Sequence, residues 1–581
     1  MATSSQLDAS RRSSAQRLIL LLIASFFLAP FASVEAQELS SDEVRFGAAQ
    51  QAFDSEHWEE AVRLATGPAN QLAKLDFVRG LALARLERWQ DSRLAFEAGH
   101  RKAPEDSRFL VELAGVAYRQ KEFSEAKREL HAALQLNAHD AYTKEFLGTL
   151  YFLDGNLEAA LTYWNPLDKP RLRNVSILPN PSLRPGLMQR TVTFHAPQIL
   201  SRDALLATES RLDSLEIFPQ KRIELAPSDA GTYDATLYLA ERNGWGNSWI
   251  AGILNIFSGL PYETVYPEFY NLNHAAVNFT SLGRWDEEKH RIFVSLTLLV
   301  RDDPSLRLQF YVDVRNENWN LSETFFGSGT PLTDLNLRRV ANGIEFRSAV
   351  NGNWGWSAGL EFSNRSFRNL EGHGTGNERA FFTKTNALVS WARFHRSILR
   401  IPEHRFALDG DVEEQFGRNF ATGLGTFATL KGALRAEWFP QPKGDDYEMR
   451  AQIRTGGTIG KTTLDDLFQL GIERDNDLWL RGHRGTNDGR KGAAPLGRRY
   501  FLANWEMDKN VYKAGFLTIK LGPFLDSGAV ADSSTLFGSR QWLWDVGVQC
   551  KIRVLNAVTV VLSYGRDLRG GRNVFYPTVL R

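Results

Sequence analysis

The stretch closest to a catalytic motif covers residues 455–462, with the sequence TGGTIGKT. A phosphate-binding P-loop needs glycine where Thr455 stands, and it needs a helix directly after the loop. The surrounding pattern predicts strands, so this segment is expected to be a strand and a turn. The sequence contains no H-E-x-x-H, no G-x-S-x-G and no Cys/His metal spacing, and Cys550 is its one cysteine. We therefore expect no enzymatic activity, no metal and no cofactor.

A second group of residues has the chemistry of ion pairs. The segment from about 471 to 500 is rich in Gly, Arg and Lys and contains Arg481. In the two stretches that follow, alternation places Asn504 and Glu506 on one face of a strand, and Asp526 on the matching face of the next strand. A basic loop opposite an acidic wall is expected to fold against it, with guanidinium groups donating to carboxylates. The alternative is an exposed basic surface loop.

The elements that carry these residues are strands. From about residue 261 to 581, apolar and polar residues alternate in stretches of about ten, as in residues 306–314, 354–362, 430–438 and 546–554. Such alternation suits a soluble sandwich, with charges outside, or a membrane barrel, with lipid outside and a polar lumen. Strand lengths near ten and Trp residues at expected strand ends favour the barrel. Those residues are Trp354, Trp438 and Trp505.

The length of this region suggests the size of the barrel. Some 320 residues, at roughly 20 per strand with its loop, predict 16 antiparallel strands, and an even number is usual in such barrels. After residue 36 the chain has no run of about 18 apolar residues, so no transmembrane helix is expected.

The N-terminal part repeats with a helical period. Four large residues each stand three positions before a small residue, at spacings of 31, 34 and 34: Trp58, Trp89, Phe123 and Leu157. A period near 34 is typical of tetratricopeptide repeats, in which two helices cross closely at small residues. About four units are expected over residues 42–174. They provide a concave peptide-docking surface or a spacer and assembly scaffold, and an unrelated helical bundle is the alternative.

A Pro-rich linker is expected over residues 175–187, because proline cannot continue a helix. Residues 188–243 then predict a small α+β domain. Its elements are a strand at 191–194, one or two helices within 201–218, and strands at 220–225 and 233–240.

The first residues predict export. Arg11, Arg12 and Arg17 precede an apolar stretch over residues 18–32, and small residues at positions 34 and 36 suit a cleavage site. A signal peptide of residues 1–36 is therefore expected, with an uncleaved anchor as the alternative.

Short motifs in the strand-rich part resemble one family. The sequences LFQLG at 467–471 and LRGH at 480–483 resemble an F-x-x-G-G…(V/L)-R-G-(F/Y) element. That element is typical of the BamA-like outer-membrane assembly and secretion superfamily, also called the bacterial surface antigen family. FLDSG at 524–528 is similar to its F-x-D-x-G strand motif, and YFLANWE at 500–506 is similar to a family strand with an inward acid. The domain at 188–243 resembles a POTRA domain, the periplasmic module of barrel translocators.

The resemblance covers about residues 188–581 and implies where the motif residues meet. It places the motif arginine, Arg481, against the motif aspartate, Asp526, inside the barrel and with Glu506 nearby. The motif residues that it implies are Arg481, Gly482, His483, Glu506, Phe524, Asp526 and Gly528. His483 replaces the usual Phe or Tyr, and Leu470 replaces one Gly. These departures, with a single POTRA-like unit, argue against a role as the main insertase of its cell.

The expected protein is thus multidomain, with a helical solenoid, a small α+β domain and a transmembrane antiparallel β-barrel. The resemblance implies an outer-membrane barrel that assists insertion or translocation of polypeptides. Its periplasmic modules would dock polypeptide clients or protein partners, and its wall would contact membrane lipids. The alternatives are a passive pore or lipid-transfer barrel, and a membrane anchor for a periplasmic repeat scaffold. A net charge of +1 gives no signal for nucleic acid as a partner.

Overall fold

The protein is represented by a computed structural model that describes residues 41–67, 71–242, 249–250, 253, 259–326, 334–371, 381–515, 517–554 and 558–580. The expected signal peptide, residues 1–36, lies outside this range. By compactness the chain divides into two units, residues 1–143 and 144–581.

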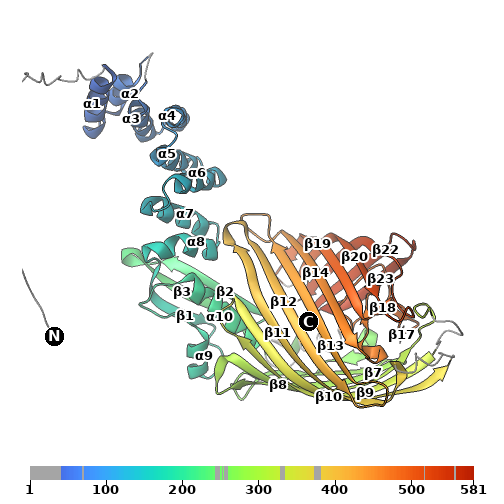
Figure 1. Cartoon of the computed structure of the whole chain (residues 1–581). Helices are drawn as coiled ribbons and strands as arrows, with labels where there is room; N and C mark the ends of the chain where they lie inside the picture. Colours follow the sequence, from blue (N-terminus) through green and yellow to red (C-terminus); the bar gives the residue numbers. More distant parts are fainter. Residues whose placement is uncertain are drawn as a thin grey trace, which may run out of the picture. The chain divides into compact units, whose positions relative to one another are not determined.

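The first unit consists of paired helices (Figure 1). They are α1 (Ser41–Asp54), α2 (Trp58–Ala65), α3 (Ala73–Arg85), α4 (Trp89–Lys102), α5 (Ser107–Arg119) and α6 (Phe123–Leu136). Three of the residues that defined the repeat, Trp58, Trp89 and Phe123, each begin the second helix of a pair. A side chain at Gly80 of α3 would collide with the buried ring of Phe96 in α4, which explains the small residue there. The paired helices are confirmed, and their assignment as tetratricopeptide repeats stays a prediction.

A further pair is formed by α7 (Ala141–Leu153), which crosses the division between the units, and α8 (Leu157–Trp164). Leu157, the fourth residue of the repeat pattern, begins α8. The side chain of Asn156 caps this helix by accepting a hydrogen bond from the backbone N–H of Ala159 at 3.1 Å. A short 3-10 helix, η1 (Asn165–Leu167), follows.

The small domain has the expected β-α-α-β-β order, but it begins earlier than expected. Its elements are β1 (Arg171–Leu178), α9 (Pro185–Thr191), α10 (Arg202–Leu215), β2 (Gln220–Pro227), η2 (Asp229–Gly231) and β3 (Thr232–Ala240). The strand order is β1-β3-β2, with β1 parallel and β2 antiparallel to β3.

Two sequence predictions are therefore wrong at this boundary. The expected linker of residues 175–187 contains half of β1 and the first three residues of α9, and the expected end of the repeats at 174 falls inside β1. The strand expected at 191–194 is also absent, because α9 runs to Thr191 and no strand is assigned to the next three residues. The first strand is β1, which pairs with β3 instead.

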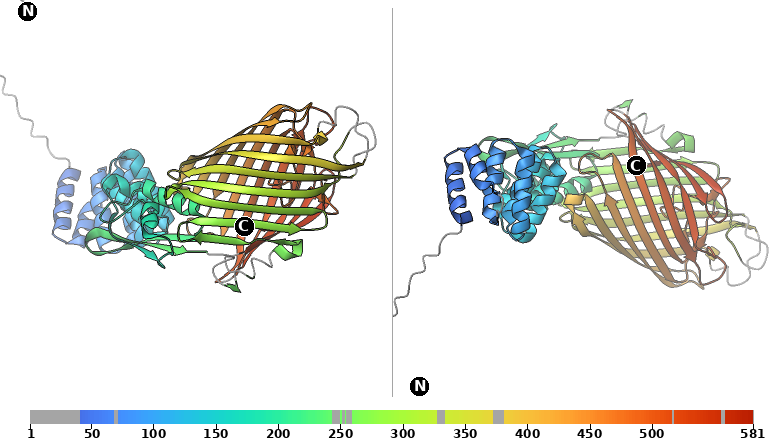
Figure 2. Two further views of the ribbon diagram at one scale, coloured as in Figure 1. Left: turned by 90° about the horizontal axis from the view of Figure 1, so that it is seen from below. Right: turned by 90° about the horizontal axis from the view of Figure 1, so that it is seen from above.

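The remaining strands form a closed antiparallel barrel (Figure 2). Its N-terminal strands are β4 (Thr264–Val265), β5 (Glu268–Leu272), β6 (Val277–Trp285), β7 (Lys289–Val300), β8 (Asp303–Trp319) and β9 (Asp334–Ala349). They follow the short η3 (Leu260–Tyr262). The middle strands are β10 (Trp354–Glu371), β11 (Thr385–Ile401), β12 (Phe406–Asn419), β13 (Thr426–Trp438) and β14 (Tyr447–Gly460), with η5 (Pro402–His404) in one turn. The last strands are β19 (Arg499–Ala514), β20 (Leu517–Ala531), β21 (Leu543–Val554), β22 (Val558–Asp567) and β23 (Asn573–Leu580).

Each long strand pairs with its neighbour in sequence, and β14 pairs with β19 across the long segment between them. The expected number of 16 strands stays a prediction, because much of the segment just before β4 lies outside the described residues. The P-loop-like residues 455–460 lie in β14, as the strand prediction required.

The two faces of the wall differ in polarity. Large apolar side chains point away from the lumen and are exposed, including Phe310, Leu360, Leu430 and Val548. The alternate positions carry buried polar side chains, including Asp313, Glu345 and Gln549. Apolar residues thus lie outside and charged residues inside, which is the reverse of a soluble sandwich.

Among the described residues, no helix combines the length and hydrophobicity needed to cross a bilayer.

Candidate functional site

The candidate site is the segment that joins β14 to β19, residues 461–498, called the inner loop below. It contains η6 (Leu464–Asp466) and the short strands β15 (Phe468–Gln469), β16 (Thr486–Asn487), β17 (Arg490–Lys491) and β18 (Leu496–Gly497). Gly457 of β14 pairs with Arg499 of β19, so the loop leaves and rejoins the wall at adjacent strands. Its side chains nevertheless contact β6, β7, β10 and β20. Contacts with strands so far apart in the wall require the loop to cross the lumen.

Apolar packing holds the inner loop at two places. Leu464, Leu467 and Leu496 form a buried cluster with wall residues that include Trp319 and Leu335. A second cluster joins the loop residues Leu470, Leu478 and Leu480 to the wall residues Tyr500, Leu502 and Val530. The inner loop and the wall therefore share two small hydrophobic cores.

Arg481 is the most connected residue of the inner loop, and it contacts the predicted acids. Its Nε donates to Asp526 Oδ2 at 2.9 Å, and its Nη2 donates to Asp526 Oδ1 at 2.7 Å. Its Nη1 donates to Glu506 Oε2 at 2.9 Å. Two parallel bonds to one carboxylate form the bidentate arrangement that guanidinium geometry favours. Arg481 is 4% exposed and Asp526 is 0% exposed, so this contact is shielded from water.

Two neighbours complete the surroundings of Arg481. The guanidinium carbon lies 3.8 Å from the centre of the Phe524 ring, a cation–π contact. Gln549 Oε1 accepts a hydrogen bond from Arg481 Nη1 at 2.9 Å. The alternation in residues 546–554 predicts Gln549 on the polar face, but no motif identifies it as a partner of Arg481. The third motif position on β20, Gly528, faces the backbone of β19: a side chain there would meet the carbonyl oxygen of Phe501 at 2.5 Å.

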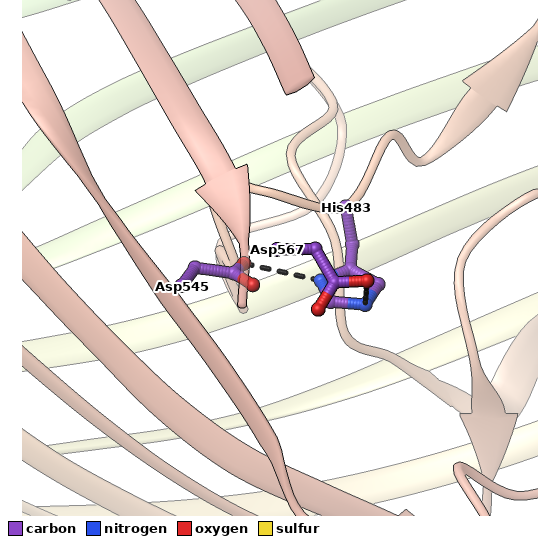
Figure 3. A group of neighbouring side chains, drawn as sticks. All are labelled: His483, Asp545 and Asp567. Atoms are coloured by element: carbon purple, nitrogen blue, oxygen red, sulfur yellow. Dashed lines mark hydrogen bonds and ion pairs between the residues drawn. The ribbon is translucent and has the colours of Figure 1, made fainter. Parts of the chain in front are cut away.

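Gly482 and His483 anchor the next part of the loop (Figure 3). The Gly482 N–H donates to Asp545 Oδ2 at 2.6 Å, and a side chain at Gly482 would collide with that carboxylate. His483 lies between two carboxylates, with Nδ1 at 3.1 Å from Asp545 Oδ2 and Nε2 at 3.6 Å from Asp567 Oδ2.

The three side chains of His483, Asp545 and Asp567 are close enough together to hold a metal ion. Each ring nitrogen already faces its own carboxylate, however, and both Asp567 oxygens accept backbone hydrogen bonds, from Arg569 and Gly570. This arrangement suits a protonated imidazolium, which donates from both nitrogens. We interpret the cluster as an ionic contact between loop and wall.

Acidic loop residues form further contacts that sequence reasoning missed. Asp475 binds Arg284 at 2.6 Å and Arg291 at 2.8 Å, on the neighbouring strands β6 and β7. Asp465 and Asp466 each bind Arg365 of β10 at 2.7 Å. The expected picture of a basic loop against an acidic wall is thus half of the arrangement, since acidic loop residues also face a basic wall.

The inner loop does not fill the lumen completely. A cavity of about 660 Å³ lies beside Asp465, Asp475 and Lys491, and a second of about 430 Å³ lies beside Trp479 and Arg481. Charged side chains of both signs line the two cavities. The lumen is therefore narrowed by a folded, ion-paired loop, and the two cavities remain beside it.

No protein-family model matches the chain, and no curated protein matches it. Solved structures do match. One is BamA from Haemophilus ducreyi lacking POTRA domains 1-3, at 11% identity and a TM-score of 0.42, covering 71% of this chain and 84% of that chain. Another is CdiB from Escherichia coli, at 12% identity and a TM-score of 0.44, covering 71% and 75%. A third is CdiB from Acinetobacter baumannii, at 13% identity and a TM-score of 0.41, covering 81% and 86%.

At these identities and TM-scores the likeness concerns the fold, and it carries no activity and no residue role over to this chain.

Proposed function

We propose that this protein is an outer-membrane β-barrel that assists the insertion or translocation of polypeptides and has no enzymatic activity. Residues from about 37 to 243 lie in the periplasm in this proposal. The observation that carries it is the polarity of the barrel wall, which is apolar outside and charged inside. A wall of this kind is stable in a bilayer and would aggregate in water.

The exposed tryptophans support the membrane position. Trp354 and Trp438 lie at the rim where β9 turns into β10 and β13 into β14, and both are exposed. Trp285 and Trp544 are exposed at the opposite rim. Tryptophan is enriched at the two membrane interfaces. Trp505, by contrast, lies within β19 and not at its end as the sequence pattern suggested.

The two modules that precede the barrel have surfaces that can bind polypeptides. Paired helices in series form surfaces on which peptides dock. In the small domain, β2 is an edge strand that pairs with β3 on one side, so an extended client could add to its free edge. Client docking to these two modules, which we assign to the tetratricopeptide and POTRA types, is the function that we propose for the periplasmic part.

Two rival functions make different demands on the barrel. A passive pore or lipid-transfer barrel needs an open path, and the ion-paired inner loop opposes a permanently open lumen. A membrane anchor for a periplasmic scaffold needs only firm attachment. Depleting the protein should lower the levels of other outer-membrane barrels if it assists their insertion. Unchanged levels of barrels and exported proteins would favour the anchor.

The membrane position has a direct test. The mature protein should stay with the membrane in a carbonate wash, and in SDS it should migrate differently before and after boiling, because a closed β-barrel resists unfolding. Recovery in the soluble fraction after the carbonate wash would contradict the proposal.

The small domain and α8 are joined to the barrel rim. The Tyr163 hydroxyl donates to Glu403 Oε1 at 2.9 Å, and Asn156 Nδ2 donates to the Pro402 carbonyl oxygen at 2.7 Å. Burial raises the pKa of Tyr163, and the Glu403 carboxylate adds to the effect, so the phenol stays protonated as a donor. Asn278 of β6 donates to the Leu215 carbonyl oxygen at 2.8 Å. This part of the chain is therefore integral to the barrel unit.

A pair of deletions tests where the independent repeats end. Removing residues 42–143 should leave a heat-modifiable barrel of nearly normal stability. Removing residues 42–174 should destabilise it, because that cut removes the buried Leu161 and Leu172 from the small domain's core and takes half of β1. Loss of two such side chains costs roughly 4 kcal/mol or more. Equal protease resistance of the small domain in both deletions would contradict this boundary.

A further inference from the structure

The outer face of the barrel has a groove that the inner loop does not explain. It has a volume of about 650 Å³ and spans β12, β13, β14, β19 and β20. Side chains that point outward along it include Leu430, Ile459, Phe501 and Ala529, so the groove is mainly apolar. The hydroxyl of Thr455, a polar group in it, donates to the Tyr500 carbonyl oxygen at 3.0 Å and is thereby satisfied.

Two glycines, Gly432 and Gly457, leave much of this hollow open, although a larger side chain would fit at either position. A Cβ at Gly457 would have its nearest neighbour, Arg499 Cγ, at 3.8 Å, and a Cβ at Gly432 would have none closer than 3.9 Å. Both are ordinary contact distances. Glycine within a strand costs stability and often marks the close approach of another molecule. Neither packing nor backbone conformation requires glycine at these two positions. The absence of side chains therefore keeps the space above them open for another molecule.

Charges of opposite sign lie at the two ends of one row of paired residues, in which Arg499 lines the groove and Glu414 lies on β12 just beyond its lining. Glu414 pairs with Leu430, Leu430 pairs with Gly457, and Gly457 pairs with Arg499, on four successive strands. Neighbouring strands are about 4.8 Å apart, so the two charged residues are separated by roughly 14 Å at the backbone. Both side chains are exposed, and neither has a hydrogen bond or ion pair among the described residues. The Arg499 side chain extends over Gly457, toward the middle of the row.

We infer that this groove binds a zwitterionic phospholipid that carries a phosphate and a primary ammonium. The acyl chain lies over Gly432 and Gly457, the phosphate meets Arg499, and the ammonium meets Glu414. This inference rests on the proposed position in the membrane, where lipid is what covers the outer wall. A lone Arg on that face is costly near the bilayer centre and tolerated near the interface. The row lies toward the rim formed by the β12–β13 turn and the start of β19, so a headgroup is within reach.

The test is lipid retention by the full chain, purified in mild detergent from vesicles that contain equal amounts of phosphatidylethanolamine and phosphatidylglycerol. Native mass spectrometry then counts the lipids that stay bound. The intact protein should retain phosphatidylethanolamine preferentially. Arg499→Gln should lower total retention about tenfold, the effect of losing roughly 1.4 kcal/mol of binding free energy. Glu414→Gln should remove the preference for phosphatidylethanolamine while phosphatidylglycerol still binds.

Two further variants separate the groove from general effects of charge and folding. Gly457→Leu fills the hollow and leaves both charges in place, so it should abolish retention in a barrel that still shifts on heating. Arg418→Gln is the matched control, because Arg418 is another exposed cation near the same rim that neither lines the groove nor belongs to the row. It lies 5.6 Å from the Phe420 ring centre and pairs with Thr426. The control variant should retain lipid as the intact protein does.

The outcomes are distinguishable from those that test the proposed function. Equal or greater retention of phosphatidylglycerol by the intact protein would overturn the inference, as would unchanged retention in Gly457→Leu. Either result leaves the barrel in the membrane. Extraction of the protein by the carbonate wash would instead contradict the proposed position in the membrane, on which the lipid site depends.

Discussion

A chain in which a short Gly/Ser linker replaces residues 462–497 should form a conducting channel, whereas the intact chain should conduct very little. The inner loop crosses the lumen and is tied to β6, β7, β10 and β20 by ion pairs. Its removal leaves the pairing of β14 with β19 intact, because Gly457 and Arg499 are register partners. Single-channel recording in planar bilayers should show a many-fold rise in conductance, since the two lumen cavities would merge into one path.

A matched excision controls for the loss of any loop. Residues 421–424, in the turn between β12 and β13, are replaced by the same linker at the same rim as the inner loop. Gly423 in this turn accepts a hydrogen bond at 3.1 Å from Lys461, a residue that the first variant keeps. The matched excision should conduct as little as the intact chain. Heat-modifiable migration of both variants establishes that their barrels are folded. If the barrel without its inner loop conducts no more than the intact protein, another element closes the lumen, and the assignment of the loop as its plug is wrong.

A milder version of this experiment keeps the loop. Asp475→Asn weakens the contacts with Arg284 and Arg291, which are both nearly buried. Removing the carboxylate charge leaves Arg284 without its ion-pair partner in a shielded site, a loss of at most about 3 kcal/mol. Arg291 keeps its bidentate contact with Asp313 at 2.9 Å. Brief openings should therefore become more frequent in single-channel records, at the conductance of the excised barrel.

The wall could be predicted from the sequence because the strand period of two is fixed by backbone geometry. Once residues 517–526 are read as a strand, the direction of Leu521 determines that of Asp526. The same reasoning predicts that Asn504 and Glu506 lie on the face that matches Asp526, and the structure confirms it. Alternation alone could not separate a sandwich from a barrel, since both satisfy it. Closure of the sheet supplies that distinction.

The path of the inner loop could not be predicted in the same way. A loop has no period, so the sequence gives no direction for Asp465, Asp475 or Gln469. The resemblance to a family motif supplied one contact, Arg481 with Asp526, and the remaining contacts depend on long-range closure of the chain. The adjacent acids Asp465 and Asp466 were a usable signal, because paired acids in a loop beside inward arginines need a cation nearby.

The error at the start of the small domain has a simpler cause. Pro170 and Pro179 flank β1, and the run of prolines at 166, 170, 179, 181 and 185 predicts a linker in this part of the chain. Residues 171–178 themselves contain no proline. Proline is compatible with the ends of an edge strand, and β1 is an edge strand in the order β1-β3-β2. Prolines that bracket eight residues are thus as compatible with a strand as with a connector.

Arg481→Ala should loosen the inner loop more than any other single substitution in it, at a cost of about 3 kcal/mol. Asp526 is fully buried and accepts two bonds from the guanidinium, one from the Arg481 backbone N–H at 3.0 Å and one from Asn504 at 2.7 Å. The substitution removes the charged partner of a carboxylate that water does not reach. The Glu506 carboxylate is destabilised less, because Lys551 remains bound to it at 2.7 Å. The barrel itself should persist, since its ladder is untouched.

The measurements compare four variants by protease sensitivity of residues 461–498 and by the temperature at which the folded band disappears from a gel. Arg484→Ala is the control, because Arg484 is an exposed cation three residues away in the same loop with no ion pair among the described residues. It should behave as the intact protein does. Arg481→Lys should lie between the intact protein and Arg481→Ala in both measurements. One ammonium group cannot replace a guanidinium that binds Asp526 and Glu506 together. Asp526→Asn should resemble Arg481→Ala.

The double variant Arg481→Ala/Asp526→Asn decides whether the two residues act through each other. If their contact is what holds the loop, the double variant should be little worse than either single variant, because each has already lost the same interaction. The coupling should then be about 2 kcal/mol, within the range for partners in one buried network. Strictly additive losses would show that Arg481 and Asp526 stabilise the protein separately. Arg481→Ala with a loop as resistant to protease as that of Arg484→Ala would show that the apolar clusters hold the loop without this contact.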